Sequence, residues 1–222
     1  DTVVLPSVVV GNKTMDNDIV GTLTLAQLYV ADGYNLTGNA ITISDVMVFQ
    51  STGSTVNVSA LNFANASTGA SLQIDGTGNS IATSVGITLP SGDFNAYVNS
   101  DFTAPDFTGS MTNFNKWGAS TLTSASGSTF TTSGGVNISE GIWGCSAADC
   151  ACDSGNFIAQ YSGGKLLFTS DVTLPNDIGL NYLSGATAVG LELNDGVGVS
   201  LTGTLNTNGS AQVQLGNGSG FQ

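Results

Sequence analysis

Three stretches of eight residues near the N-terminus share one hydrophobic pattern: residues 23–30 are LTLAQLYV, residues 41–48 are ITISDVMV and residues 56–63 are VNVSALNF. The first, third, sixth and eighth residues of each stretch are apolar. Alternation with a period of two predicts strands that bury one face. Because the stretches begin at residues 23, 41 and 56, the pattern indicates a repeated β structure.

The doubled gap in the middle of each stretch has two interpretations. It fits a bulge in an antiparallel strand, where one extra residue restores the inward face. It also fits the corner of a stacked solenoid coil. Turn-forming segments such as Asp32-Gly33 and Asn39 separate the stretches, and this is compatible with both interpretations.

The C-terminal part indicates antiparallel pairing. Apolar residues alternate over 189–193 and 197–201, on either side of Asn194-Asp195-Gly196. Asp-Gly between two alternating runs is a strong β-hairpin signal. We therefore predict an all-β fold, an antiparallel β-sandwich or jelly-roll-like domain, with a β-solenoid in the N-terminal half as the alternative. Residues 1–18 are expected to form an N-terminal strand segment and residues 19–222 a single β-rich domain.

Composition narrows the class of protein. Of the 222 residues, 41% are hydrophobic and only 9% are charged, and the formal net charge is −13. Lys13, Lys116 and Lys165 are the only lysines, and arginine and histidine are absent. Nucleic acid is therefore not expected as a partner, because phosphate binding depends on Lys and Arg. No apolar run is long enough for a membrane-spanning helix. With a chain that opens at Asp1, we expect a processed extracellular or cell-surface protein.

Few residues suit catalysis. Without histidine, no Ser-His or Cys-His pair forms, and Glu140 and Glu192 are the only glutamates. We predict that the chain is not an enzyme and has no cofactor, except for Ca²⁺ as a weak candidate. Oxygen-rich turns suit Ca²⁺, although Asp and Asn are also ordinary turn residues. The calcium candidates are Asp16, Asp18 and Asp75.

Three cysteines lie close together, at Cys145, Cys150 and Cys152. An exported protein is expected to oxidise a close pair. A ring that includes Cys145 is easier to close than one between Cys150 and Cys152, which leaves the odd cysteine free or available to cross-link subunits. A metal site completed by aspartate and three buried thiols are the alternatives.

Several Asn-x-Ser/Thr sequons are candidates for glycosylation if the chain is exported. They are Asn12, Asn35, Asn65, Asn137, Asn208 and Asn217.

Aromatic residues gather in the middle of the chain. One interpretation places them in a core covered by irregular loops, and the other places them on a sugar-binding face. They are Phe94, Tyr97, Phe102, Phe107, Phe114 and Trp117.

The N-terminal segment is apolar and β-branched, so it must pair with a sheet to avoid aggregation. It either forms a strand of its own domain or is donated to a neighbouring subunit. The candidate assembly residues are Val3, Val4, Leu5, Val8, Val9 and Val10. We therefore predict a structural subunit of an extracellular assembly, such as a filament, coat or adhesin, with copies of itself as partners. The alternatives are a module that binds carbohydrate or another surface, and a virion or tail component.

Overall fold

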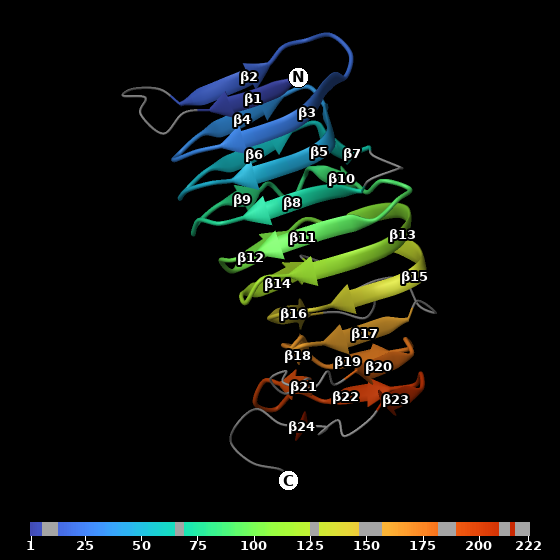
Figure 1. Cartoon of the computed structure of the whole chain (residues 1–222). Coiled ribbons are helices and arrows are strands. Elements are labelled where there is room, and N and C mark those ends of the chain that lie inside the picture. The colour runs from blue at the N-terminus through green and yellow to red at the C-terminus, as the bar shows by residue number, and fades with distance from the viewer. Residues whose placement is uncertain are drawn as a thin grey trace.

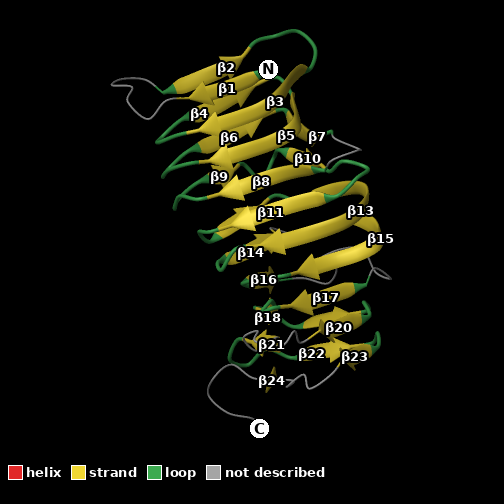
Figure 2. Ribbon diagram, viewed as in Figure 1, coloured by secondary structure: helices red, strands yellow, loops and turns green. Residues whose placement is uncertain are grey.

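The chain folds as a parallel β-solenoid. The computed structural model describes residues 1–5, 13–64, 69–124, 129–146, 157–181, 190–208 and 214–215. Every strand pair among these residues is parallel, and each strand pairs with a strand of a neighbouring coil. Figure 1 shows the coils stacked along one axis from the N-terminal to the C-terminal end, and Figure 2 shows the strands joined by loops.

One sheet contains twelve strands and forms two sides of the coil. They are β1 (Thr2–Leu5), β3 (Leu23–Val30), β5 (Ile41–Phe49), β7 (Ala60–Phe63), β8 (Ala70–Ile74), β10 (Gly86–Thr88), β11 (Phe94–Val98), β13 (Phe107–Trp117), β15 (Thr129–Ile138), β17 (Ile158–Tyr161), β20 (Ile178–Asn181) and β23 (Leu205–Asn208).

The remaining strands form three smaller sheets. A four-stranded sheet holds β2 (Thr14–Asn17), β4 (Asn35–Gly38), β6 (Thr55–Val58) and β9 (Ser80–Ile81). A six-stranded sheet holds β12 (Phe102–Ala104), β14 (Thr121–Ser124), β16 (Ile142–Cys145), β18 (Lys165–Phe168), β21 (Gly190–Leu193) and β24 (Gln214–Leu215). Strands β19 (Val172–Leu174) and β22 (Val199–Leu201) pair with each other.

The twelve-stranded sheet bends within its long strands. Strand β5 pairs through residues 41–43 with β7 and through residues 46–49 with β8, and β7 and β8 are separate strands. The β3–β5 register shifts between Leu25 and Gln27, and the β13–β15 register shifts between Met111 and Asn113. We call the side that contains β1, β8, β11, β17, β20, β23 and the later residues of the long strands the first face. The four- and six-stranded sheets form the second face, and β7, β10 and the earlier residues of the long strands form the third.

The prediction of an antiparallel sandwich or jelly roll is wrong. Strand β21 pairs with β18 and β24, whereas β22 pairs with β19. The Asn194-Asp195-Gly196 turn, closed by the Val197 amide donating to the Asn194 carbonyl (3.1 Å), therefore links two sides of a coil and not two strands of a hairpin. The solenoid, which we considered only for the N-terminal half, extends through the described part of the chain.

The interior is filled by columns of apolar side chains that repeat from coil to coil. The rings of Phe63 and Phe94 lie 4.9 Å apart, those of Phe94 and Phe114 5.3 Å apart, and Phe114 also contacts Phe130 (5.2 Å) and Trp143 (4.8 Å). All five side chains are buried. Such aromatic contacts add to the free energy gained from burial.

Phe114 is at the centre of this stack, so its truncation is expected to leave a cavity. Phe114→Ala should lower the free energy of unfolding by about 3–5 kcal/mol. The measurement is urea denaturation followed by far-UV circular dichroism. Thr103→Ala, at an exposed position of β12, is the control and should change stability little. Equal effects of the two substitutions would contradict the assigned core.

Gly118, the first residue after β13, has a left-handed conformation (φ 82°), and a Cβ there would lie 2.5 Å from the Val98 carbonyl oxygen of the previous coil. Gly196 has a similar φ of 79° but nothing within 4 Å of such a Cβ. Both alanine variants incur about 1–2 kcal/mol of backbone strain. Gly118→Ala should lower the melting temperature clearly more than Gly196→Ala, because it also pushes two coils apart. The same melting temperature for both variants would contradict this coil spacing.

Candidate assembly end and outer binding face

At the N-terminal end of the solenoid, the first described strands have a strand neighbour on one side only. Within the described residues, β1 pairs only with β3 and β2 pairs only with β4. At the opposite end, β23 pairs only with β20 and β24 only with β21 in that same part of the chain. Among the described residues, one edge of β1 and one edge of β23 therefore remain for pairing with a further parallel strand.

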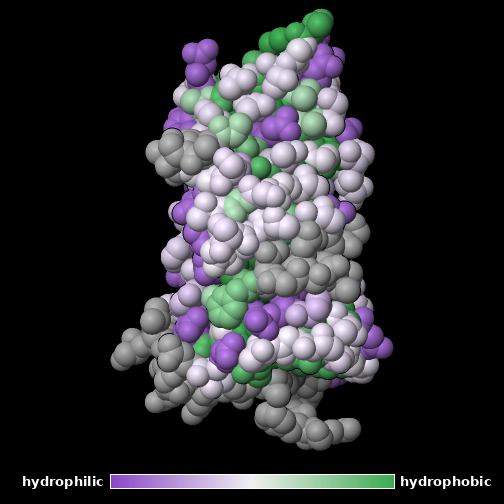
Figure 3. Space-filling view, turned by 90° about the vertical axis from the view of Figure 1, so that its right-hand side faces the viewer, coloured by the Kyte–Doolittle hydropathy of each residue, from purple (hydrophilic) through white to green (hydrophobic). Residues whose placement is uncertain are grey.

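The N-terminal end is also apolar. Val4 is 57% exposed and Val20 is 98% exposed, and Met15 and Ile19 are exposed beside them. Figure 3 shows hydrophobic side chains gathered at this end of the molecule. We call these four residues the end surface. Exposed apolar residues concentrated in one place indicate an interaction site.

A cavity of about 190 Å³ opens at the same end, so the core of the first coils is not closed. Its lining is mainly apolar and includes Val3, Leu5, Leu23, Leu25, Leu28 and Ile41. A further coil placed on this end would extend the same apolar columns.

The predicted assembly residues lie partly at this end. Val3, Val4 and Leu5 belong to β1, which pairs in register with residues 28–30 of β3 in the same chain. Leu5 is buried and Val3 packs against the core. Val8, Val9 and Val10 lie outside the described residues. Strand donation through these residues therefore stays a prediction.

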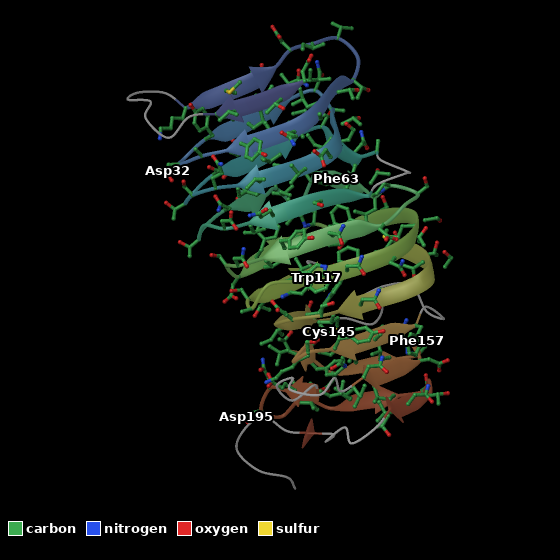
Figure 4. All side chains as sticks on the ribbon, viewed as in Figure 1. Asp32, Phe63, Trp117, Cys145, Phe157 and Asp195 are labelled. Atoms are coloured by element: carbon green, nitrogen blue, oxygen red, sulfur yellow. The ribbon has the colours of Figure 1, made fainter. Side chains whose placement is uncertain are left out.

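A second exposed surface lies on the first face. Tyr97 of β11 and Trp117 of β13 are register partners on adjacent strands, and each is 39% exposed. The Phe157 ring, also exposed, lies over Gly179, where an added Cβ would lie 2.4 Å from the tip of the ring. Tyr161, half-buried, follows the buried Gln160 in β17 and therefore points outward. We call these four aromatic residues the outer aromatic surface; Trp117 and Phe157 are labelled in Figure 4.

A ladder of asparagine amides runs beside these rings. The Asn115 Nδ2 donates to Asn95 Oδ1 (3.1 Å), and the Asn137 Nδ2 donates to Asn115 Oδ1 (2.9 Å). The three residues are register partners on β11, β13 and β15. Our sequence analysis missed this ladder, although asparagines at 95, 115 and 137 recur at the length of one coil.

The predicted aromatic cluster is divided between the interior and the surface. Phe94, Phe102, Phe107 and Phe114 are buried, as the core interpretation expected. Tyr97 and Trp117 are on the outside, because strand alternation places them on the opposite side of the sheet from Phe94 and Phe114.

Two of the three predicted calcium residues, Asp16 and Asp75, accept hydrogen bonds from other side chains of the protein. Asp16 Oδ1 accepts from Thr37 Oγ1 (3.0 Å), and Asp75 accepts from the amides of Asn99 (2.8 Å) and Gln73 (2.7 Å). Asp18 lines the end cavity. No group of three or more potential ligand side chains occurs in the described part of the chain. The structure thus keeps Asp75 apart from Asp16, and calcium binding stays a prediction.

Other aspartates bind the next coil. Their carboxylates accept hydrogen bonds from backbone N–H groups that follow 20 to 27 residues later. The pairs are Asp32 with Thr52 (3.1 Å), Asp101 with Thr121 (2.8 Å), Asp171 with Gly198 (2.7 Å) and Asp177 with Thr204 (2.6 Å). Asp32 and Asp195, both in turns between strands, are labelled in Figure 4.

Cys145 ends β16, is buried and is disulfide-bonded. Its partner lies outside the described residues, and so do Cys150 and Cys152. The pairing therefore stays a prediction.

The sequons fall in different settings. Asn35 is exposed on β4, whereas Asn137 is half-buried and its Nδ2, the atom that would carry a glycan, donates to Asn115. The Asn208 side chain and residues Asn12, Asn65 and Asn217 lie outside the described part. Glycosylation is untested at all of them.

Lys116 is a buried cation near the end of β13. Its Nζ donates to the carbonyl oxygens of Gly118 (2.5 Å), Ser120 (2.6 Å) and Glu140 (2.9 Å). Each of the three N–H groups of the ammonium therefore has an acceptor. Burial lowers the pKa of Lys116 to about 8, and the charges of Glu140 and Asp101 oppose this shift. Its role is structural, because it fastens two successive turns together.

The lowered pKa of Lys116 predicts a pH-dependent stability. The unfolded lysine keeps its proton up to about pH 10.5, whereas the folded one loses it near pH 8. Between these values the unfolded state binds more protons, so this residue's contribution to stability rises with pH. The difference in unfolding free energy between wild type and Lys116→Met should therefore increase from pH 8 to pH 10, measured by urea denaturation.

Lys165→Met is the matched control for loss of a lysine, since Lys165 lies partly exposed beside Glu192. The same pH slope in both variants would contradict the assignment to Lys116.

Comparisons with known proteins give no functional information: no protein-family model, no curated protein and no solved structure matches this chain. Among the described residues, no helix has the length and apolarity required to cross a membrane.

Proposed function

We propose that this chain is a non-catalytic structural subunit of an extracellular assembly and that its copies stack end to end through parallel β-strand pairing. The observation that supports this most is the N-terminal end, where β1 has a strand partner on one side only among the described residues and an open apolar cavity lies beside it. An adhesin, a coat and a filament could each be built through this same end-to-end contact.

The partner that binds the N-terminal end is a second copy of the chain. The strands at both ends of a parallel solenoid run in the same direction. The C-terminal edge of one copy can therefore pair with the N-terminal edge of the next copy in the same way as successive coils pair within one chain. Such a head-to-tail contact does not close on itself and generates a filament. Backbone hydrogen bonds give the affinity, as in β-augmentation.

The composition supports the same function. Only 9% of the residues are charged and the surface depends on short neutral side chains, which suit sheets exposed in an assembly. Export to the cell surface is part of the proposal, and the buried disulfide at Cys145 favours an oxidising compartment.

The end surface provides the test. Placing lysines on it, as Val4→Lys/Val20→Lys, should weaken self-association by about tenfold or more, because burying one valine is worth ~1.5 kcal/mol. Sedimentation velocity over a concentration series, with negative-stain electron microscopy of the same samples, measures the assembly.

Thr88→Lys, at an exposed position of β10 on the third face, is the control that adds a lysine away from the end. It should leave the polymers intact. A wild-type chain that stays monomeric at high concentration, or a double variant that polymerises normally, would refute end-to-end assembly.

A further inference from the structure

The outer aromatic surface has the chemistry of a saccharide site. Its rings lie along the solenoid axis, because register partners on adjacent parallel strands are separated by about 4.8 Å. Tyr97 and Trp117 are one strand apart. Trp117 and Tyr161 are two strands apart, since Lys116 pairs with Ile138 and Ile138 with Gln160. Two strand spacings, about 10 Å, match the length of a disaccharide unit.

The amide ladder supplies polar groups next to the rings. Asn95 is the acceptor at one end of the ladder, and its own Nδ2 has no hydrogen-bond partner within the described part of the chain. This leaves two N–H donors available to a ligand. The ladder also fixes the amide positions, since each of its two hydrogen bonds orients the next side chain.

The charges on this surface select the kind of ligand. Lys116 is buried with its Nζ bonded to three carbonyls, so it offers no positive charge to a ligand. Lys13 donates to the Asp32 carbonyl and Lys165 is paired with Glu192 on the second face. With a net charge of −13 and no exposed cation there, the surface repels polyanions.

We propose that the outer aromatic surface binds a neutral polysaccharide chain lying along the solenoid axis. The rings of Tyr97, Trp117 and Tyr161 stack on the apolar faces of successive sugar rings. The Asn95 amide donates to a sugar hydroxyl or ring oxygen. A flat, exposed strip of rings with a few fixed polar groups suits an extended polymer better than a small molecule, which needs an enclosing pocket.

Binding is tested with soluble neutral polysaccharides, namely β-1,3-glucan, β-1,4-mannan and chito-oligosaccharides, by isothermal titration calorimetry and affinity electrophoresis. Tyr97→Ala/Trp117→Ala should weaken binding at least about tenfold. Trp117→Phe, which keeps a ring, should retain most of the affinity. Asn95→Ala should weaken binding and lower the melting temperature only slightly, because it also removes one hydrogen bond of the ladder.

Thr103→Ala, exposed on the second face in the coil that contains Tyr97, is the control and should bind as wild type does. Val4→Lys/Val20→Lys should also bind, which separates this proposal from end-to-end assembly. Binding that survives loss of both rings, binding to the polyanion alginate in preference to the neutral polymers, or no binding to any of them would overturn the proposal.

Discussion

Parallel backbone pairing between successive coils is the constraint on which the rest of this structure depends. A strand here pairs with residues about one coil away, as Met15 pairs with Leu36 and Leu36 with Val56. Once that spacing is set, side chains of one coil lie directly over those of the next, and identical positions form columns. Phenylalanines then stack on phenylalanines inside, and asparagines bond to asparagines outside. Each coil is stabilised by its neighbours, as in other solenoids.

The same stacking explains how an acidic chain with three lysines folds. Carboxylates in the turns accept hydrogen bonds from backbone N–H groups of the following coil, as Asp32 does from Thr52 and Asp101 from Thr121. Hydrogen bonds to a charged acceptor are stronger than neutral ones, so paired cations are not needed. Lys116 makes the complementary contact, with an ammonium bonded to carbonyls of two successive turns. Polar residues thus fix the spacing of turns, and apolar columns fill the space between them.

Strand positions could be predicted from the sequence, but strand partners could not. The alternation at residues 23–30 and 56–63 located β3, β6 and β7, and the doubled gaps were corners of the coil. The corner of residues 41–48 contains two residues, whereas the corner of residues 23–30 contains one. As a result Met47 pairs with Leu28 and is buried, although the pattern predicted that Val46 would point inward. The Asp-Gly at 195–196 has the same local chemistry in a hairpin and in a solenoid corner. Only the long-range register distinguishes them, and a local pattern does not contain it.

End-to-end stacking and saccharide binding reinforce each other geometrically. If copies add along the solenoid axis, the first face continues from one subunit to the next, and each subunit contributes one outer aromatic surface to a common line. A long polysaccharide chain lying along that line meets many weak sites at once, and its second and later contacts are intramolecular. Because avidity then depends on polymer length, a single subunit needs only modest affinity. The outer aromatic surface with the Asn95 amide beside it is adequate for a subunit that acts in this way.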